Sequence, residues 1–329
     1  MGSTRSVPRR GYHVPMTIFV YEQITAALDA GHSLYREGLA MREAVIDDFR
    51  RLGDVEILAI PDGTSESDLG AIFDDCVRRS DGALLIAPET GGELLRLAER
   101  VLALGGKLLG PQPEAIQLSS DKFRLFEHWC RDGVPTPDTW VFDGSLPCLP
   151  AVLKPRDGAG SCETLLIRGG TDAIPFETPP GRFIIQRIAP GRAASVAFIV
   201  CNEVPIPLTP CFQSISNDGH FHYSGGSLPI PAALADRAIR LGLQAIDRIP
   251  GLNGYIGVDL ILGETAAEDA AIEINPRLTT SYVGLLRHSP WNMAGLMLNR
   301  RVAQPIEAAT VEFQADGLWS IPSKVREGP

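Results

Sequence analysis

The chain has no long basic run and no long apolar run. Its formal net charge is −10, from 30 lysine and arginine residues against 40 aspartate and glutamate residues. This balance predicts against a nucleic acid or an anionic membrane as a partner. No apolar stretch approaches the ~20 residues that a membrane-spanning helix needs. An acidic balance is ordinary for a cytoplasmic enzyme, and we expect a cytoplasmic location.

The cysteines are scattered through apolar segments and include no C-x-x-C pair. This pattern is typical of reduced, mostly buried thiols and argues against a structural zinc site. The first predicted strand is not followed by G-x-G-x-x-G, so a nicotinamide cofactor has no support there. Residues 1–15 carry basic residues but no apolar core, and we interpret them as a disordered extension or an upstream start, not a secretory signal.

What the chain does contain is an alternation of strand-like and helix-like segments between residues 16 and 112. Short apolar runs begin near Met16, Val55, Gly82 and Lys107, and amphipathic helical patterns separate them. This alternation predicts a small parallel sheet covered on both faces. The chain is 44% hydrophobic, enough for one large core or for two to three smaller ones. The predicted fold class is α/β (α+β).

The pattern changes after residue 112. A capped helix and a Pro-rich loop are followed, from Ala151, by strand-like segments in close succession with no helix between them. Such spacing is typical of antiparallel sheet. One further helix, over residues 232–249, precedes two strands that carry polar side chains in apolar surroundings.

The last of these strands, A-A-I-E-I-N from Ala270, has polar residues at alternate positions. Glu273 and Asn275 share one face, and Arg277 joins them if the strand persists. Asp259 lies within the preceding apolar strand, where an isolated carboxylate would be costly. If the strands pair, Asp259, Glu273 and Asn275 form an all-oxygen cluster that suits Mg²⁺ shared with phosphate. The alternative is a solvent-facing polar face with Asp259 in a salt bridge.

A second signal is K-P-R-D-G-A-G-S, which begins at Lys154. A lysine closes an apolar strand, and bare backbone N–H groups in the following glycine-rich loop can cradle phosphate. The alternative is an ordinary glycine-rich hairpin turn, because the segment is not a G-x-x-x-x-G-K-[ST] loop. Lys122, which follows Ser120 and Asp121 near a helix start, is a weaker candidate whose default interpretation is a solvated lysine.

The order of motifs is more specific than its parts. D-K at residues 121–122 is followed by G-V-P-T-P, K-P with the glycine loop, Q-R-I-x-P-G, G-V-D and E-I-N-P-R. This order resembles the ATP-grasp superfamily of carboxylate–amine and carboxylate–thiol ligases. The resemblance covers residues 110–290 and implies an ATP-grasp fold with an N-terminal pre-ATP-grasp domain over residues 16–112. It implies an ATP-grasp domain over residues 113–310, with a lid over 120–188, a large subdomain over 189–310 and a tail over 311–329.

The resemblance implies a nucleotide site and cofactors. ATP would bind with one or two Mg²⁺ ions, for which Mn²⁺ could substitute. The residues implied to contact the phosphates are Lys122 and Lys154, with Gly158, Ala159, Gly160 and Ser161 as a covering loop. Those implied to border adenine, partly through backbone groups, are Gln186, Arg187 and Ile188. Many members have a glutamate that binds ribose, but this chain has Ala193 and Ala194 there, which leaves Ser195 as the candidate.

The resemblance also implies the reacting centre. Asp259, Glu273 and Asn275 would hold the metal. Arg277 would steady the transferred phosphoryl group or the acyl-phosphate, and Lys154 and Asn275 would act beside it. Charge neutralisation and positioning are what phosphoryl transfer to a carboxylate needs.

Further segments resemble a subgroup of ATP-grasp ligases related to tyramine–glutamate ligase of methanofuran biosynthesis. They include V-Y-E, S-L-x-x-E-G-x-A-M, Q-S-I, Y-S-G-G and N-P-R-L-T-T-S-Y. The implied partners are a small carboxylate, with L-glutamate first, and a tyramine- or tyrosine-like amine; a homodimer is an open expectation. Candidate pocket residues are Glu22, Glu37, Tyr223 and Tyr282, for which packing or surface roles are the alternative. The histidines show no metal-ligand spacing and are assigned no catalysis.

Two other functions stay open on the sequence. One is a non-catalytic nucleotide-binding module that keeps the fold, against which the intact Lys154, Asp259, Glu273, Asn275 and Arg277 argue. The other is an ATP-grasp reaction of carboxylase type or with different substrates.

Overall fold

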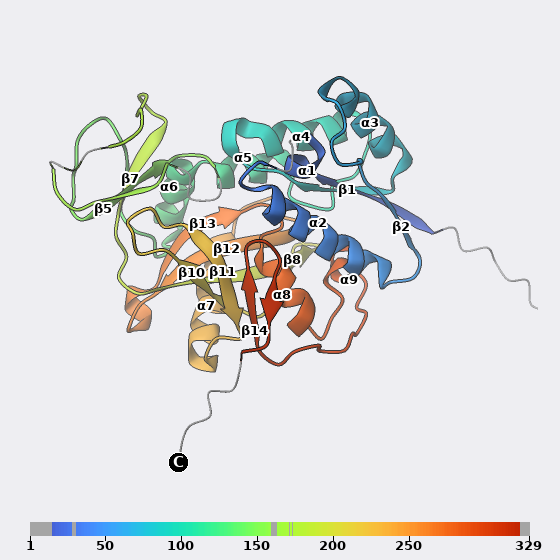
Figure 1. The fold of residues 1–329 in the computed structure, drawn as a ribbon. Helices are drawn as coiled ribbons and strands as arrows, with labels where there is room; N and C mark the ends of the chain where they lie inside the picture. The colour runs from blue at the N-terminus through green and yellow to red at the C-terminus, as the bar shows by residue number, and fades with distance from the viewer. Residues whose placement is uncertain (1–14, 28–30, 159–162, 171, 173, 323–329) are drawn as a thin grey trace, which may run out of the picture.

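The computed structural model describes residues 15–27, 31–158, 163–170, 172 and 174–322. Apart from Pro15, the predicted extension over residues 1–15 lies outside these ranges. Figure 1 shows a small α/β layer packed on a large sheet, with a separate small sheet containing β5 and β7 to one side. Among the described residues, no helix is both long enough and apolar enough to cross a membrane.

The N-terminal part is a parallel three-stranded sheet, as predicted. The central strand β1 (Met16–Glu22) pairs with β2 (Val55–Leu58) on one side and with β3 (Gly82–Ile86) on the other. The expected fourth strand near Lys107 is reduced to an isolated parallel bridge between Ala83 and Leu108. The helices of this part are α1 (Gln23–Ala27), α2 (Tyr35–Arg50), α3 (Glu66–Arg79), α4 (Glu93–Ala103) and α5 (Pro113–Ser120), with the turn η1 (Thr90–Gly92).

Helix α4 illustrates why these segments fold as they do. Its buried residues Leu94, Leu97, Ala98 and Val101 recur at helical spacing, so they form one apolar stripe. All four belong to the core cluster that includes Phe19 and the other side chains on that face of the sheet. Burial of this stripe fixes the helix against the sheet.

The small sheet corresponds to the predicted lid. Its strands β4 (Thr139–Val141), β5 (Ala151–Pro155), β6 (Leu165–Ile167) and β7 (Phe183–Arg187) are antiparallel in the order β4-β7-β5-β6. Helix α6 (Lys122–Asp132) leads into it. Asp121 caps this helix by accepting from the backbone N–H groups of Phe123 and Arg124, and Gly133 ends it with a φ of 72°.

The large sheet has eight strands, in the order β13-β12-β8-β10-β11-β14-β15, with β9 paired to β8. Its elements are β8 (Arg192–Cys201), β9 (Val204–Pro207), β10 (Cys211–Ile215), β11 (Tyr223–Leu228), α7 (Ala232–Ile246), β12 (Gly254–Leu262), η2 (Ala266–Glu268), β13 (Ala270–Asn275), α8 (Ser281–His288), α9 (Met293–Met297), β14 (Val311–Gln314) and β15 (Trp319–Ser320). The last two lie in the segment predicted as a tail, which thus contributes strands to the sheet.

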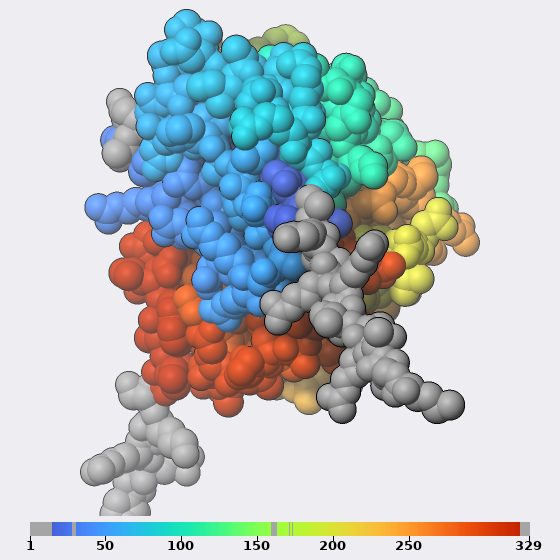
Figure 2. Space-filling view, turned by 90° about the vertical axis from the view of Figure 1, so that its right-hand side faces the viewer, coloured from blue at the N-terminus to red at the C-terminus, as the bar shows by residue number. Residues whose placement is uncertain are grey.

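A buried carboxylate joins the N-terminal part to the large subdomain. Asp48 of α2 accepts hydrogen bonds from the Tyr282 hydroxyl at 2.7 Å and from the Ala294 backbone N–H at 2.8 Å. Asn292 donates to the Asp48 carbonyl oxygen at 2.8 Å. Figure 2 shows the blue N-terminal part and the red C-terminal part in contact along this face. Tyr282, a candidate pocket residue, is therefore committed to the core between the two parts.

Candidate active site

The pairing of β12 with β13 brings the predicted oxygen cluster together. Asp259 lies directly opposite Glu273, and Gly257 lies opposite Asn275, with a register shift after Asp259. The Asn275 side-chain amide donates to Asp259 Oδ2 at 3.1 Å. The polar strand face is therefore not a solvated surface, and Asp259 is held by amides instead of by a salt bridge.

Gln213 completes the hydrogen bonding of Asp259 and was missed by sequence reasoning. Its side-chain amide, on β10, donates to Asp259 Oδ1 at 2.9 Å. The sequence signal was the Q-S-I segment, which was noted for its resemblance but given no chemistry. Because both Asp259 oxygens accept from amides, the carboxylate is fixed in orientation toward Glu273.

The two facing carboxylates have opposite pKa shifts. Burial, with the neighbouring charge of Glu273, raises the pKa of Asp259. Burial also acts to raise the pKa of Glu273, but Lys122 and Lys154 outweigh it and lower that pKa. Like charges this close favour a shared proton or a cation. The pair is thus suited to receive positive charge.

The two predicted lysines lie beside this pair. Lys122 Nζ is 3.3 Å from Glu273 Oε2 and donates to the Gly158 carbonyl oxygen at 3.0 Å. Its side chain is only 11% exposed, so the default interpretation of a solvated lysine is wrong. Lys154, at the end of β5, is buried, and this burial lowers its pKa to about 8.

A small hollow opens at this point between the lid, α5 and β13. Its lining combines cationic, anionic and amide groups: Glu89, Ser119, Ser120, Lys122, Gly158, Glu273, Ile274 and Asn275. We call it the phosphate hollow. Of the predicted covering loop, Gly158 lies here, whereas Ala159, Gly160 and Ser161 fall outside the described residues.

The start of the glycine loop contacts the N-terminal part. Asp157 Oδ2 accepts from the Gly91 backbone N–H at 2.8 Å. Gly158 has a φ of 121°, and a Cβ there would lie 3.1 Å from Thr90 Oγ1. A glycine is therefore required by conformation at this position.

Arg277 is placed differently from the expectation. Strand β13 ends at Asn275, and Arg277 turns toward the N-terminal part, where its Nε lies 3.0 Å from Glu89 Oε1. Its Nη2 donates to Glu89 Oε2 at 3.2 Å and its Nη1 to the Leu278 carbonyl oxygen at 3.0 Å. Burial opposes the charge of Arg277, but Glu89 outweighs this effect and raises the pKa of the guanidinium.

Glu89 was also missed from the sequence. It follows the apolar strand β3 and is 4% exposed. A carboxylate three residues beyond an apolar strand was the available signal, but its partner lies 188 residues further along the chain. Only the folded arrangement reveals this pair between the two parts.

The residues predicted around adenine lie where the lid joins the large sheet. Gln186 is buried and donates to Thr139 Oγ1 at 2.9 Å, while Arg187 is exposed and donates to Asp138 Oδ2 at 3.0 Å. Ile188 follows β7 directly. Ser195, on β8, is buried, and its hydroxyl is 3.2 Å from Cys211 Sγ. Their contacts with adenine and ribose stay predictions.

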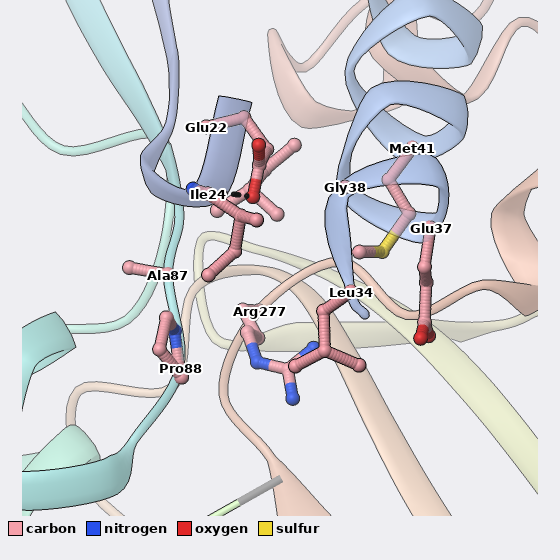
Figure 3. A pocket seen from close by; sticks show the side chains of 10 residues that line it. Glu22, Ile24, Leu34, Glu37, Gly38, Met41, Ala87, Pro88 and Arg277 are labelled. Carbon is pink, nitrogen blue, oxygen red and sulfur yellow. Dashed lines mark hydrogen bonds between the residues drawn. The ribbon is translucent and has the colours of Figure 1, made fainter. Parts of the chain in front are cut away.

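A second, larger hollow lies between the N-terminal part and Arg277. Figure 3 shows Glu22 and Glu37 on its wall with Arg277 across from them. The other lining residues are largely apolar: Ile24, Leu34, Gly38, Met41, Ile86, Ala87 and Pro88. We call it the acid-lined hollow. Glu22 and Glu37 line this hollow, whereas Tyr223 and Tyr282 are not among the described residues that line it; that a substrate binds here stays a prediction.

The two acids of this hollow are held differently. Glu22 is 3% exposed and accepts from the backbone N–H groups of Ile24 at 3.1 Å and Thr25 at 2.7 Å. Burial raises its pKa despite these bonds. Glu37, in the first turn of α2, is half-buried and accepts from the Thr280 hydroxyl.

The oxygen cluster fits the predicted Mg²⁺. Two facing carboxylates and an amide supply hard oxygen donors, and Mg²⁺ commonly takes one or two carboxylates together with phosphate oxygens. Within the described residues, no group of three or more His, Cys, Asp and Glu side chains is arranged around a metal position. The cluster offers two carboxylates, so nucleotide phosphates would have to complete the coordination of a bound ion.

A parallel α/β part, a lid sheet and a large antiparallel sheet meet around lysines and paired carboxylates, and this is the architecture of an ATP-grasp enzyme. The model of the ATP-grasp domain matches residues 119–281, and the model of the pre ATP-grasp 3 domain matches residues 45–116. The chain belongs to the ATP-grasp family and is a carboxylate–amine ligase, as its motifs predicted.

Known relatives agree with this assignment. The chain is 31% identical to tyramine–L-glutamate ligase of Methanocaldococcus fervens over 241 residues, which are 73% of this chain and 72% of that protein. It is 32% identical to the Methanocaldococcus jannaschii protein of the same name over 205 residues, 62% of this chain and 58% of that one. A solved ATP-grasp superfamily protein from Archaeoglobus fulgidus superposes with a TM-score of 0.70 at 25% identity, covering 90% of this chain and 92% of that one.

Proposed function

We propose that the chain joins L-glutamate to a small amine of the tyramine type, using ATP. A glutamate carboxylate attacks the γ-phosphorus, and the bond to the β-phosphate oxygen breaks to give an acyl-phosphate and ADP. The amine nitrogen then attacks the acyl carbon and loses a proton, and phosphate leaves with the electrons of the broken C–O bond. The products are a glutamyl amide, ADP and phosphate. The names of the two curated relatives support these substrates.

The observation that carries this proposal is the adjacency of the two hollows. Arg277 lines the acid-lined hollow, while its ion-pair partner Glu89 lines the phosphate hollow. Pro88 lines the acid-lined hollow, and Glu89, the next residue in the chain, lines the phosphate hollow. A carboxylate bound next to Arg277 would thus be adjacent to a γ-phosphate held by Lys122. Phosphoryl transfer from ATP to a carboxylate needs such adjacency of the two reactants.

Each residue has a defined task in this reaction. Lys122 and Lys154 would bind phosphate oxygens, and Asp259, Glu273 and Asn275 would hold the metal. Mg²⁺, or Mn²⁺ in its place, supplies positive charge against the transferred phosphoryl group when bound. Arg277 would face the acyl-phosphate with Glu89 fixing its guanidinium plane.

The metal assignment is tested with matched carboxylate-to-amide variants. Asp259→Asn and Glu273→Gln should each lower ADP formation by roughly 100-fold at limiting Mg²⁺, because a charge that binds the metal is lost. Glu264→Gln, which removes an exposed charge beyond β12, is the control and should keep the wild-type rate. Wild-type rates in both site variants would refute the assignment of these residues.

We further propose a cytoplasmic setting, where ATP and Mg²⁺ are supplied, and a place in methanofuran-type C1 cofactor biosynthesis. The relatives' activity toward tyramine and L-glutamate supports this setting. Mass spectrometry of the product tests the proposed substrates, because it shows whether the product contains glutamate. Its fragmentation pattern distinguishes an α-glutamyl from a γ-glutamyl amide. A product that contains no glutamate would overturn the substrate proposal while leaving ligase chemistry in place.

A further inference from the structure

We propose that the acid-lined hollow is the amine subsite, that it selects a primary ammonium on an apolar body without a carboxylate, and that Glu37 is the residue that determines this choice. The proposal rests on the proposed function and extends it, because the relatives' names state which amine they use and not how it is recognised. It assigns a substrate class to residues of this chain.

The lining of the hollow favours a cation with an apolar body. Ile24, Leu34, Met41, Ile86 and Pro88 supply apolar surface, and Glu22 and Glu37 supply two carboxylates. An apolar pocket with a few placed charges fixes both the shape and the orientation of a small ligand. A methionine in the wall also packs well against an aromatic ring. An arylalkyl ammonium matches both components.

The hollow disfavours a carboxylate on the same ligand. Arg277 is the cation among its described lining residues, and the proposed function assigns it to the carboxylate of L-glutamate, so it is not free for a carboxylate on the amine. A ligand carboxylate in the amine position would face Glu22 and Glu37, and like charges in a desolvated site are strongly disfavoured. The hollow should therefore accept a decarboxylated amine and reject the parent amino acid.

Glu37 and Glu22 have different tasks. Glu22 uses both carboxylate oxygens to accept backbone N–H groups at the start of α1, which makes it part of the wall. Glu37 is half-buried, accepts from the Thr280 side chain, and extends from α2 with Leu34 between it and Arg277 in the view of Figure 3. A carboxylate anchored on one side by a hydroxyl, at the edge of an apolar hollow, is placed to accept from an ammonium.

The position of Glu37 also fits the second half-reaction. Its charge acts on Arg277, which the proposed function places against the acyl-phosphate. An ammonium bound by Glu37 would thus lie within the same hollow as the acyl carbon, which its nitrogen attacks once it has lost a proton. Orientation of the nitrogen by one fixed carboxylate lowers the entropic cost of that step.

The test is a binding titration that needs no turnover. Calorimetry would measure the affinity of the full chain for three probes: tyramine, L-tyrosine, which adds a carboxylate, and 4-ethylphenol, which lacks the ammonium. We expect tyramine to bind about tenfold or more tightly than either of the others. Equal affinity for tyramine and L-tyrosine, or for tyramine and 4-ethylphenol, would overturn the proposal, as would no tyramine binding.

Variants then assign the selection to Glu37. Glu37→Gln should weaken tyramine binding roughly tenfold and leave 4-ethylphenol unchanged, because only the charge interaction is removed. Glu43→Gln, on the exposed side of the same helix, is the matched control and should bind as the wild type does.

Leu34→Trp, which fills the hollow with all charges kept, should weaken the binding of both tyramine and 4-ethylphenol. Unchanged tyramine affinity in Glu37→Gln, or in Leu34→Trp, would refute the assignment. Failure of the proposed function has a different signature: absent ADP release with tyramine binding intact.

Discussion

Replacing Glu89 with glutamine removes the negative charge that faces Arg277 between the N-terminal part and the large subdomain. In the wild type, Glu89 Oε1 lies 3.0 Å from Arg277 Nε, and Glu89 Oε2 lies 3.2 Å from Arg277 Nη2. Glu89 is only 4% exposed, so water has little access to solvate the Arg277 charge once its partner is lost. Removing one partner of a buried ion pair costs about 3–5 kcal/mol. Glutamine keeps an acceptor, and Arg277 retains the Leu278 carbonyl oxygen. We therefore expect a loss of about 2–4 kcal/mol in the free energy of unfolding.

Urea denaturation of Glu89→Gln, Arg277→Met and the double variant measures this loss and its origin. The double variant should be less destabilised than the sum of the single variants by about 1 kcal/mol or more, because no unpaired charge remains. ADP formation by Glu89→Gln should fall mainly in kcat, with the KM for ATP nearly unchanged, since the lysines and the oxygen cluster are intact. A Glu89→Gln chain of wild-type stability, or strict additivity of the two changes, would refute the reasoning.

Two further predictions concern the nucleotide site and the acid-lined hollow. Lys154→Ala should weaken ATP binding roughly tenfold by calorimetry, because a buried ammonium that we propose to contact phosphate is lost. The exposed Lys107→Ala should have no effect, and equal affinities of the two variants would show Lys154 to be uninvolved. Gly38→Ala should weaken tyramine binding about fivefold or more, because its Cβ would lie 2.6 Å from the Glu22 carboxyl carbon and push that side chain into the acid-lined hollow. Gly110→Ala, with no atom within 4 Å of its new Cβ, is the control, and tyramine affinity equal to this control would contradict the clash.

The oxygen cluster could be predicted from the sequence because strand periodicity is local. Glu273 and Asn275 are two residues apart on one strand, so their shared face follows from the alternation of side chains. The only tertiary assumption was that the next strand pairs with the Asp259 strand, and these strands are joined by a short connection. The pairing of Asp259 with Glu273 follows from that assumption.

Arg277 could not be placed by the same rule. Pro276 has no backbone N–H to continue the ladder, and strand β13 ends just before it. The proline was visible in the E-I-N-P-R motif, but where the chain would turn depends on Glu89, which a distant part of the sequence supplies. Gln213 and Tyr282 were likewise beyond local reasoning, since their partners Asp259 and Asp48 are fixed only by the packing of the sheet and helices.

The central claim is that a carboxylate oxygen of the substrate becomes bonded to the γ-phosphorus of ATP. L-Glutamate labelled with ¹⁸O in its carboxylates, incubated with ATP, Mg²⁺, tyramine and the chain, tests this claim directly. An acyl-phosphate route transfers one labelled oxygen to each phosphate released, with ADP as the other nucleotide product. Mass spectrometry of the phosphate should therefore show the label in step with glutamyl-amide formation. Unlabelled phosphate, or label found in AMP with pyrophosphate released, would contradict the account.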